Sequence, residues 1–217
     1  MLAEAGLLGR REVATHWANG DLFRRCYREV RMRADEVLCL SSVGDRIVTA
    51  GAVAAWQDLA LWLIARFCGP LQALETAKLF LLATHDDGQL PYSAMQQPAA
   101  GSDAVISECQ NWIAENYSLD NPVQRMAQRS GLNPRTFARR FRQASGDQLI
   151  DYVQTLRIEE AKHMLEVSDL GLDEIAASVG YEDPASFRQL FRLKSALTPT
   201  AYRRKFQSIS KLDRAPH

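Results

Sequence analysis

The chain has 217 residues, of which 47% are hydrophobic and 24% charged; this composition suits one large or two small globular domains and excludes a disordered or collagen-like chain. Its 26 Lys and Arg residues balance 26 Asp and Glu residues, so a surface for nucleic acid would have to come from local clustering of basic side chains. The four cysteines form no CxxC pair, and the sequence has no uninterrupted apolar stretch of about 20 residues, so we expect a cytoplasmic protein with reduced thiols and no membrane partner.

The first part of the chain mixes short alternating segments with longer amphipathic ones. The short segments predict strands at residues 12–16, 30–33 and 46–49. The longer segments predict helices at residues 19–27, 52–67 and 71–82. Strands that alternate with helices are typical of α/β layers. The helix at 52–67 is apolar on most of its circumference, so we expect it to be buried.

A break in composition follows, where PYSAMQQPAAGS contains two prolines, small polar residues and no charge. It predicts a linker, placed at residues 94–103, between a first domain at 1–93 and a second at 104–208. The second domain shows no strand pattern. Its predicted helices lie at residues 105–116, 123–130, 134–144, 148–166, 172–179, 184–194 and 199–206. The predicted fold class is therefore α+β overall, with an α/β portion followed by an all-α domain.

The second domain repeats itself: MAQRSGLNPRTFARRFR (126–142) aligns with IAASVGYEDPASFRQLFR (175–192), with one residue inserted. Each copy has a glycine suited to ending a helix, then a capping residue and a proline that begin the next helix. Two phenylalanines four residues apart mark the buried face of that next helix. The pattern predicts two helix-turn-helix units, at residues 123–144 and 172–194, whose second helices enter the major groove of DNA. The turn residues are Gly131, Asn133 and Pro134 in the first unit and Gly180, Asp183 and Pro184 in the second.

The face opposite the phenylalanines is rich in Arg and Gln, and no acidic residue occurs between Pro134 and Ser145. Exposed arginines are also typical of a plain solvated helix face, but their place on the second helix of two helix-turn-helix units favours contact with DNA. There, Arg can pair with guanine and Gln with adenine. The helix predicted at 148–166 would be about 28 Å long, close to the ~34 Å between successive major grooves on one side of B-DNA. One chain could then contact two adjacent major-groove segments.

Residues 104–208 resemble the DNA-binding domain of the AraC/XylS family of transcription regulators. The resemblance is carried by IAASVGYEDPASFRQLFRLKSALTPTAYRR (175–204) and by Arg157, Ala161 and Leu165 within LRIEEAKHML. It implies seven helices and a role in transcription. Ala196 stands where the family usually has glycine, which should leave the fold intact and tighten that turn.

The resemblance also implies which side chains meet DNA. The residues that would contact bases are Arg135, Thr136, Ala138 and Arg139 in the first unit and Ala185, Ser186, Arg188 and Gln189 in the second. The residues that would hold phosphates are Arg140, Arg142, Arg192 and Lys194. Since alanine offers only a methyl contact, hydrogen-bonded recognition should depend on the arginines and Gln189.

Residues 2–17, 45–64 and 85–93 resemble the C-terminal part of the ThiJ/PfpI family, a glutamine-amidotransferase-like domain that precedes the DNA-binding half in one branch of AraC regulators. In that family a nucleophilic cysteine lies on a strand-to-helix elbow just before the segment that here reads LAEAGLL. Since the sequence begins at Met1, we expect residues 1–93 to form a partial domain without this elbow. His16 matches the histidine near the missing cysteine, and we expect a structural role for it.

No catalytic residue, cofactor or metal site is predicted, and we expect a solvated turn at His85-Asp86-Asp87. The sequence therefore predicts a sequence-specific transcription regulator, not an enzyme, that binds double-stranded DNA through two recognition helices. A partial α/β domain leaves strand edges and apolar faces uncovered, so residues 1–93 should either pair with a second copy or be loosely ordered. RNA polymerase becomes a partner if the protein is an activator, and a partial domain argues against a small-molecule effector site. Two alternatives stay open: a truncated regulator that titrates a longer relative, and an amidotransferase-like hydrolase, against which the absent nucleophile argues.

Overall fold

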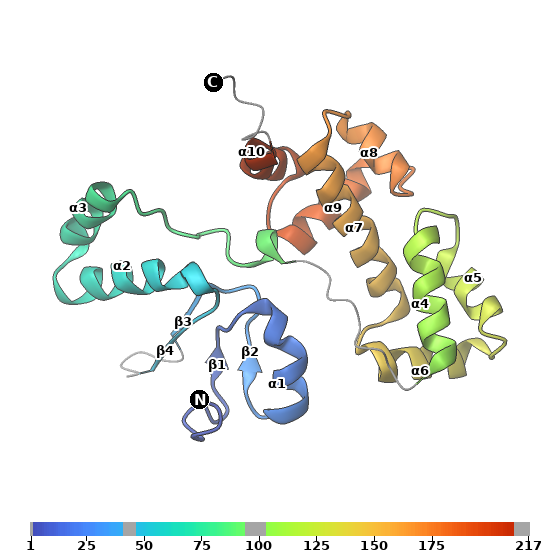
Figure 1. Ribbon diagram of the computed structural model, residues 1–217, viewed down its shortest axis with the longest axis horizontal. Helices are drawn as coiled ribbons and strands as arrows, with labels where there is room; N and C mark the ends of the chain where they lie inside the picture. Colours follow the sequence, from blue (N-terminus) through green and yellow to red (C-terminus); the bar gives the residue numbers. More distant parts are fainter. Residues whose placement is uncertain (1, 41–46, 94–102, 211–217) are drawn as a thin grey trace. The chain divides into compact units, whose positions relative to one another are not determined.

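The computed structural model describes residues 2–40, 47–93 and 103–210, and the chain divides into two compact units, 1–93 and 94–217 (Figure 1). The linker predicted at 94–103 lies outside the described residues except for Asp103.

The first unit contains two small sheets. Strand β1 (Glu12–Val13) pairs in parallel with β2 (Arg31–Met32), and β3 (Leu38–Leu40) pairs antiparallel with β4 (Val48–Ala50). The strands predicted at 12–16 and 30–33 correspond to β1 and β2. The one predicted at 46–49 corresponds to β4, and its first residue lies outside the described residues. Strand β3 was not predicted.

Helices connect and extend these sheets. A 3-10 turn, η1 (Trp17–Asn19), and α1 (Gly20–Cys26) join β1 to β2. After β4 come η2 (Val53–Ala55), α2 (Trp56–Phe67), α3 (Pro70–Phe80) and η3 (Leu90–Tyr92). Only Asp58 and Leu61 of α2 are buried, and the residues of α3 are exposed or half-buried. The expectation that the helix at 52–67 is buried is wrong for these residues, because two-stranded sheets cover little of an apolar helix.

The described part of the second unit is all helical, as predicted. Its helices are α4 (Ala104–Asn116), α5 (Pro122–Arg129), α6 (Pro134–Ser145), α7 (Leu149–Val167), α8 (Leu172–Ser178), α9 (Pro184–Ser195) and α10 (Pro199–Ser210). Each corresponds to a helix predicted from the sequence, and α10 extends beyond its predicted end. Figure 1 shows α7 running from the group formed by α4, α5 and α6 to the group formed by α8, α9 and α10.

The second unit has two hydrophobic cores, one for each helix-turn-helix, and α7 contributes to both. Tyr152 and Val153 of α7 belong to the first core, while Ile158, Ala161 and Leu165 belong to the second. The four phenylalanines of the repeat are fully buried: Phe137 and Phe141 in the first core, Phe187 and Phe191 in the second. Burial of each such side chain contributes roughly 1.5–3 kcal/mol to the free energy of folding. The two helix-turn-helix units are thus separately packed and share α7.

Candidate nucleic-acid interface

The turn of each helix-turn-helix has the backbone geometry that the sequence predicted. Gly131 and Gly180 follow the first helices with φ of 65° and 86°, in the left-handed region that favours glycine. Asn133 Oδ1 then accepts a hydrogen bond from Thr136 N at 2.9 Å, capping α6. The cap of α9 is Asp183, whose carboxylate accepts hydrogen bonds from two backbone N–H groups, at 2.9 and 3.0 Å. Each recognition helix therefore begins at a fixed residue.

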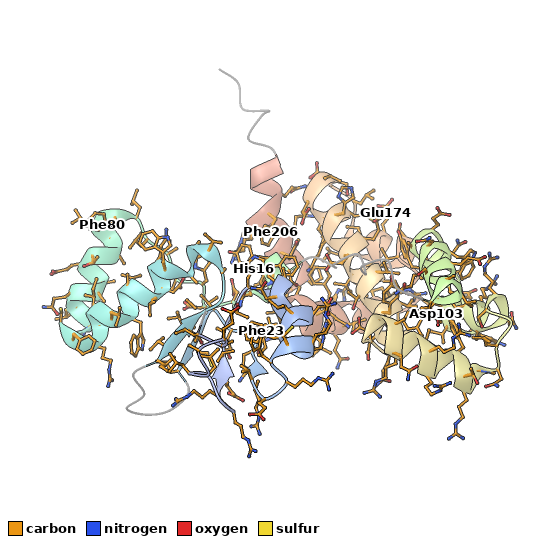
Figure 2. The ribbon with its side chains drawn as sticks, turned by 60° about the horizontal axis from the view of Figure 1, so that its bottom comes forward. His16, Phe23, Phe80, Asp103, Glu174 and Phe206 are labelled. Atoms are coloured by element: carbon orange, nitrogen blue, oxygen red, sulfur yellow. The ribbon has the colours of Figure 1, made fainter. Side chains whose placement is uncertain are left out.

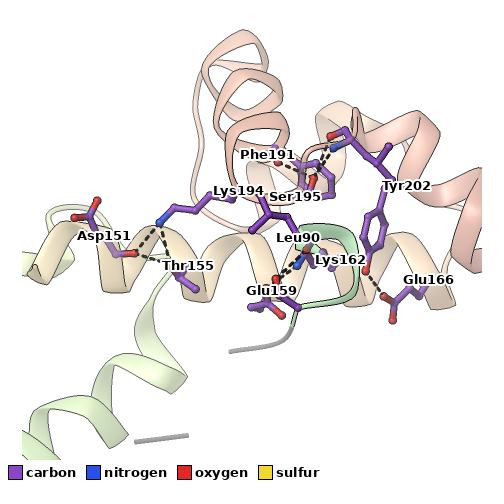
Figure 3. Close-up of polar contacts among 12 residues, drawn as sticks. Leu90, Asp151, Thr155, Glu159, Lys162, Glu166, Phe191, Lys194, Ser195 and Tyr202 are labelled. Atoms are coloured by element: carbon purple, nitrogen blue, oxygen red, sulfur yellow. Dashed lines mark hydrogen bonds and ion pairs between the residues drawn. The ribbon is translucent and has the colours of Figure 1, made fainter. Parts of the chain in front are cut away.

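The ends of the recognition helices are also matched between the units. Ser145 Oγ donates to Phe141 O at 2.8 Å, and Ser195 Oγ donates to Phe191 O at 2.7 Å (Figure 3). Helix α6 is followed by Gly146 with φ 82°, and α9 by Ala196 with φ 60°. Ala196 is therefore an alanine in the left-handed conformation, which costs about 1–2 kcal/mol relative to glycine.

The faces of α6 and α9 opposite the phenylalanines are exposed. Thr136 and Arg140 on α6, and Lys194 on α9, are half-buried. The other predicted contact residues are exposed: Arg135, Ala138, Arg139, Arg142, Ala185, Ser186, Arg188, Gln189 and Arg192. A groove of about 1050 Å³ lies between the two helix-turn-helix units and is lined by residues of both, including Ala138 and Ser186. These nine side chains therefore lie on the outer surface of α6 and α9.

Within the described part of the chain, Ser186 Oγ donates to an oxygen of Asp183 at 2.6 Å, and three further predicted DNA contacts are also engaged. Arg140 Nε and Nη2 donate to the two oxygens of Asp103, at 2.8 and 2.7 Å, and Asp103 lies at the start of α4 (Figure 2). These hydrogen bonds, more than any other contact, hold the pKa of Asp103 below its usual value. Lys194 Nζ donates to Thr155 Oγ1 at 3.0 Å (Figure 3). The third is Arg188, whose Nη2 lies 2.6 Å from an oxygen of Asp173.

Arg157 of α7 holds the two helix-turn-helix units together. Its Nε donates to Tyr117 O at 2.8 Å and its Nη2 to Leu119 O at 3.1 Å, both beyond the end of α4. Its Nη1 donates to Gly180 O at 2.8 Å, in the turn of the second helix-turn-helix unit. The guanidinium also lies over the Tyr181 ring, 5.2 Å from its centroid. Charge clustering alone did not mark this residue, which the sequence pointed to only through the family resemblance.

Cysteine and histidine side chains are the candidates for nucleophilic or acid–base chemistry in this chain. All four cysteines are free, and burial raises the pKa of the Cys39 and Cys109 thiols, the opposite of what activates a nucleophile. His16 Nδ1 accepts from Ala18 N at 3.2 Å and caps η1, which is a structural role. The solvated turn expected at residues 85–87 is wrong for His85, because its Nδ1 lies 2.8 Å from an oxygen of the buried Asp58 carboxylate.

Among the residues that the structure describes, no group of three or more His, Cys, Asp and Glu side chains is arranged to hold a metal ion. None of the described helices has both the length and the apolar character needed to cross a bilayer.

Residues 126–205 match a family model described as a helix-turn-helix domain. The second unit therefore contains a helix-turn-helix domain. The chain is 26% identical over 209 residues to the HTH-type transcriptional regulator GlxA of Rhizobium meliloti, covering 94% of this chain and 62% of that protein. It is 27% identical over 205 residues to the HTH-type transcriptional regulator CdhR of Pseudomonas aeruginosa, covering 92% of this chain and 59% of that protein. The chain therefore spans about six-tenths of the length of these curated relatives.

Among solved structures, part of this chain is similar to the DNA-binding domain of AdpA, a global transcriptional factor crystallised in complex with a target DNA. The sequences are 30% identical, and the match covers 51% of this chain and 99% of that one, with a TM-score of 0.48.

Proposed function

We propose that this chain is a sequence-specific transcription regulator that binds double-stranded DNA through α6 and α9. The observation that carries the proposal is the doubled helix-turn-helix: each unit buries two phenylalanines and turns the opposite face of its second helix to solvent. The naming of GlxA and CdhR as transcriptional regulators, and the DNA complex of AdpA, support it. Such a protein would act in the cytoplasm, with RNA polymerase as a partner if it activates transcription.

The length of α7 supports contact with two adjacent segments of one DNA face. This helix has 19 residues, which corresponds to about 28 Å at 1.5 Å per residue. Successive major-groove segments on one side of B-DNA lie about 34 Å apart. Because Arg157 fixes the second helix-turn-helix unit to the end of α4, the two recognition helices would meet the duplex as one rigid pair.

We propose a division of roles among the exposed side chains. Arg135 and Arg139 of α6, together with Arg188 and Gln189 of α9, would contact base edges, where bidentate pairs discriminate between bases. Arg142 and Arg192 would hold phosphates. Arg140 and Lys194, also predicted as phosphate contacts, would first have to leave Asp103 and Thr155. The remaining predicted positions, Thr136, Ala138, Ala185 and Ser186, would make smaller contacts with bases.

The test is selection of bound duplexes from a random pool, followed by fluorescence-anisotropy titrations over a salt series. The proposal predicts an enriched site with two short blocks about one helical turn apart. Arg139→Ala should relax base preference at one position, whereas Arg192→Ala should weaken binding to all duplexes and lower the salt slope by about 1. Absence of binding to any duplex would overturn the proposal. Equal losses on all sequences for both variants would overturn the division of roles.

The first unit favours a second role, pairing with another copy. Helices α2 and α3 leave large apolar side chains at the surface, whose exposed fractions are 76% for Phe67, 68% for Leu71, 77% for Leu79, 65% for Phe80 and 91% for Leu81. We propose that residues 1–93, which resemble part of the ThiJ/PfpI domain, form a homodimer or a mixed dimer with a longer relative. Sedimentation of the full chain and of Phe67→Ser should show a dimer that the substitution weakens. A monomer at all concentrations would overturn this role.

A further inference from the structure

The two helix-turn-helix units differ in charge at three equivalent positions around their recognition helices. The second unit has an arginine flanked by two aspartates, whereas the first has an alanine flanked by two neutral amides. The aligned pairs are Arg188 and Ala138, Asp173 and Gln124, and Asp183 and Asn133. The carboxylates thus occur in the unit that has the arginine, and neither occurs in the unit that lacks it.

The structure brings these three charged groups together. Arg188 Nη2 donates to Asp173 Oδ1 at 2.6 Å, from the second helix of the unit back to the first turn of α8. Asp183 lies one turn before Arg188 on the capping side, where its carboxylate accepts from Ser186 Oγ at 2.6 Å and from two backbone N–H groups. Asp173 therefore holds the guanidinium, while Asp183 is occupied with capping.

The Arg188–Asp173 pair lies in solvent, with the two side chains 50% and 69% exposed. An ion pair this exposed contributes little to the free energy of folding. An acidic side chain beside a recognition helix also repels DNA phosphates, which weakens non-specific binding. General affinity for DNA does not account for a carboxylate at this position, and Glu174 shares its favourable place in the first turn of α8.

The hydrogen-bonding capacity of Arg188 leaves room for a base. A guanidinium has five N–H donors, and Asp173 accepts from one of its nitrogens. Two parallel N–H groups are enough to pair with O6 and N7 of guanine. A long side chain already held in one orientation loses less conformational freedom when it binds than a free one does.

We infer that Asp173 is a specificity-determining positioning residue, which orients Arg188 to recognise a guanine in the DNA segment contacted by α9. The inference rests on the proposed function, since it assumes that α9 meets bases. The ligand is a guanine in duplex DNA. The first unit has no counterpart of this device, because Ala138 offers only a methyl group and Gln124 carries no charge.

The experiment measures relative affinities for the selected site and for its single-base variants, using the full chain. Asp173→Asn should lower the preference for guanine at one position of the α9 block by about fivefold or more, part of the discrimination of a bidentate pair. The matched control is Glu174→Gln, which removes the same charge from the neighbouring exposed residue of α8 (Figure 2). Both variants should bind non-specific duplex slightly more tightly, and Glu174→Gln should keep the guanine preference.

A double-mutant cycle shows whether Asp173 acts through Arg188. In the Arg188→Ala background, Asp173→Asn should change base preference at no position. If the wild-type chain selects no site, the proposed function itself fails. If it selects a site and Asp173→Asn keeps the full guanine preference, or gains affinity for the selected site without losing that preference, the inference is overturned. Unchanged circular dichroism and melting temperature of the variants show that the fold is retained.

Discussion

Arg157 Nη1 donates a hydrogen bond to the carbonyl oxygen of Gly180 at 2.8 Å, and this contact joins α7 to the turn of the second helix-turn-helix. The close approach requires glycine: a Cβ on Gly180 would lie 2.9 Å from Arg157 Nη2 and 2.5 Å from Ser118 O. The equivalent Gly131 has no atom within 4 Å of such a Cβ. The repeat therefore uses one glycine for backbone conformation alone and the other also for contact between the units.

Arg157→Lys should loosen the connection between the two helix-turn-helix units. Lysine keeps the charge but lacks the planar fork that reaches the carbonyls of Tyr117, Leu119 and Gly180. Hydrogen exchange in peptides that cover α7 and the Gly180 turn should show a free energy of opening lower by about 2 kcal/mol. Affinity for the two-block site should fall more than affinity for a single block. Arg204→Lys, at an exposed position of α10, is the control; an Arg157→Lys chain indistinguishable from it would contradict this role.

Ala196→Gly should stabilise the second helix-turn-helix unit. Ala196 has φ 60°, where a side chain is strained and glycine is not, so the gain should be about 1 kcal/mol in the free energy of unfolding. The aligned residue after α6 is already glycine, so the reciprocal change Gly146→Ala should destabilise by a similar amount. Thermal melts of the two variants should shift in opposite directions. A lower melting temperature for Ala196→Gly would show that the turn is not strained.

Loss of the Asp103–Arg140 pair should contribute to acid sensitivity. The pKa of Asp103 is lowered in the folded chain, chiefly by the hydrogen bonds from Arg140, relative to about 3.9 in an unfolded chain. The stabilisation is therefore present above the unfolded pKa and is lost as the pH falls through the lower, folded pKa. Asp103→Asn should show a smaller drop in melting temperature than wild type between about pH 5 and pH 2. Asp120→Asn serves as the control, and equal drops in all three proteins would contradict the role of the pair.

The second unit was largely predictable from sequence because its signals are local. The turn glycines, the caps at Asn133 and Asp183, and the phenylalanine pairs each act within a few residues, and the structure has all of them as predicted. The Arg140–Asp103 contact was not predictable in this way, because its partners are 37 residues apart in the chain and meet only when α4 packs on α6.

The first unit was harder to predict because its strands are short and its hydrogen bonds involve side chains. Strand β3 reads Leu-Cys-Leu, an apolar run without alternation, which periodicity does not distinguish from a helix segment. Strand β1 ends after Val13, and the next N–H, that of Ala14, donates to Thr49 Oγ1 at 2.9 Å instead of to a backbone partner. No local sequence pattern predicts such a contact between residues 35 positions apart.

If α6 and α9 contact two adjacent major-groove segments as one rigid pair, the spacing between the two blocks of the selected site is critical. The deciding measurement is the affinity for a site in which about five base pairs, half a helical turn, are inserted between the two blocks. The insertion turns one block to the opposite side of the duplex, out of reach of a second unit fixed by Arg157. Affinity for the expanded site should fall to that of a site with one block. Unchanged affinity for the expanded site would contradict the rigid pair.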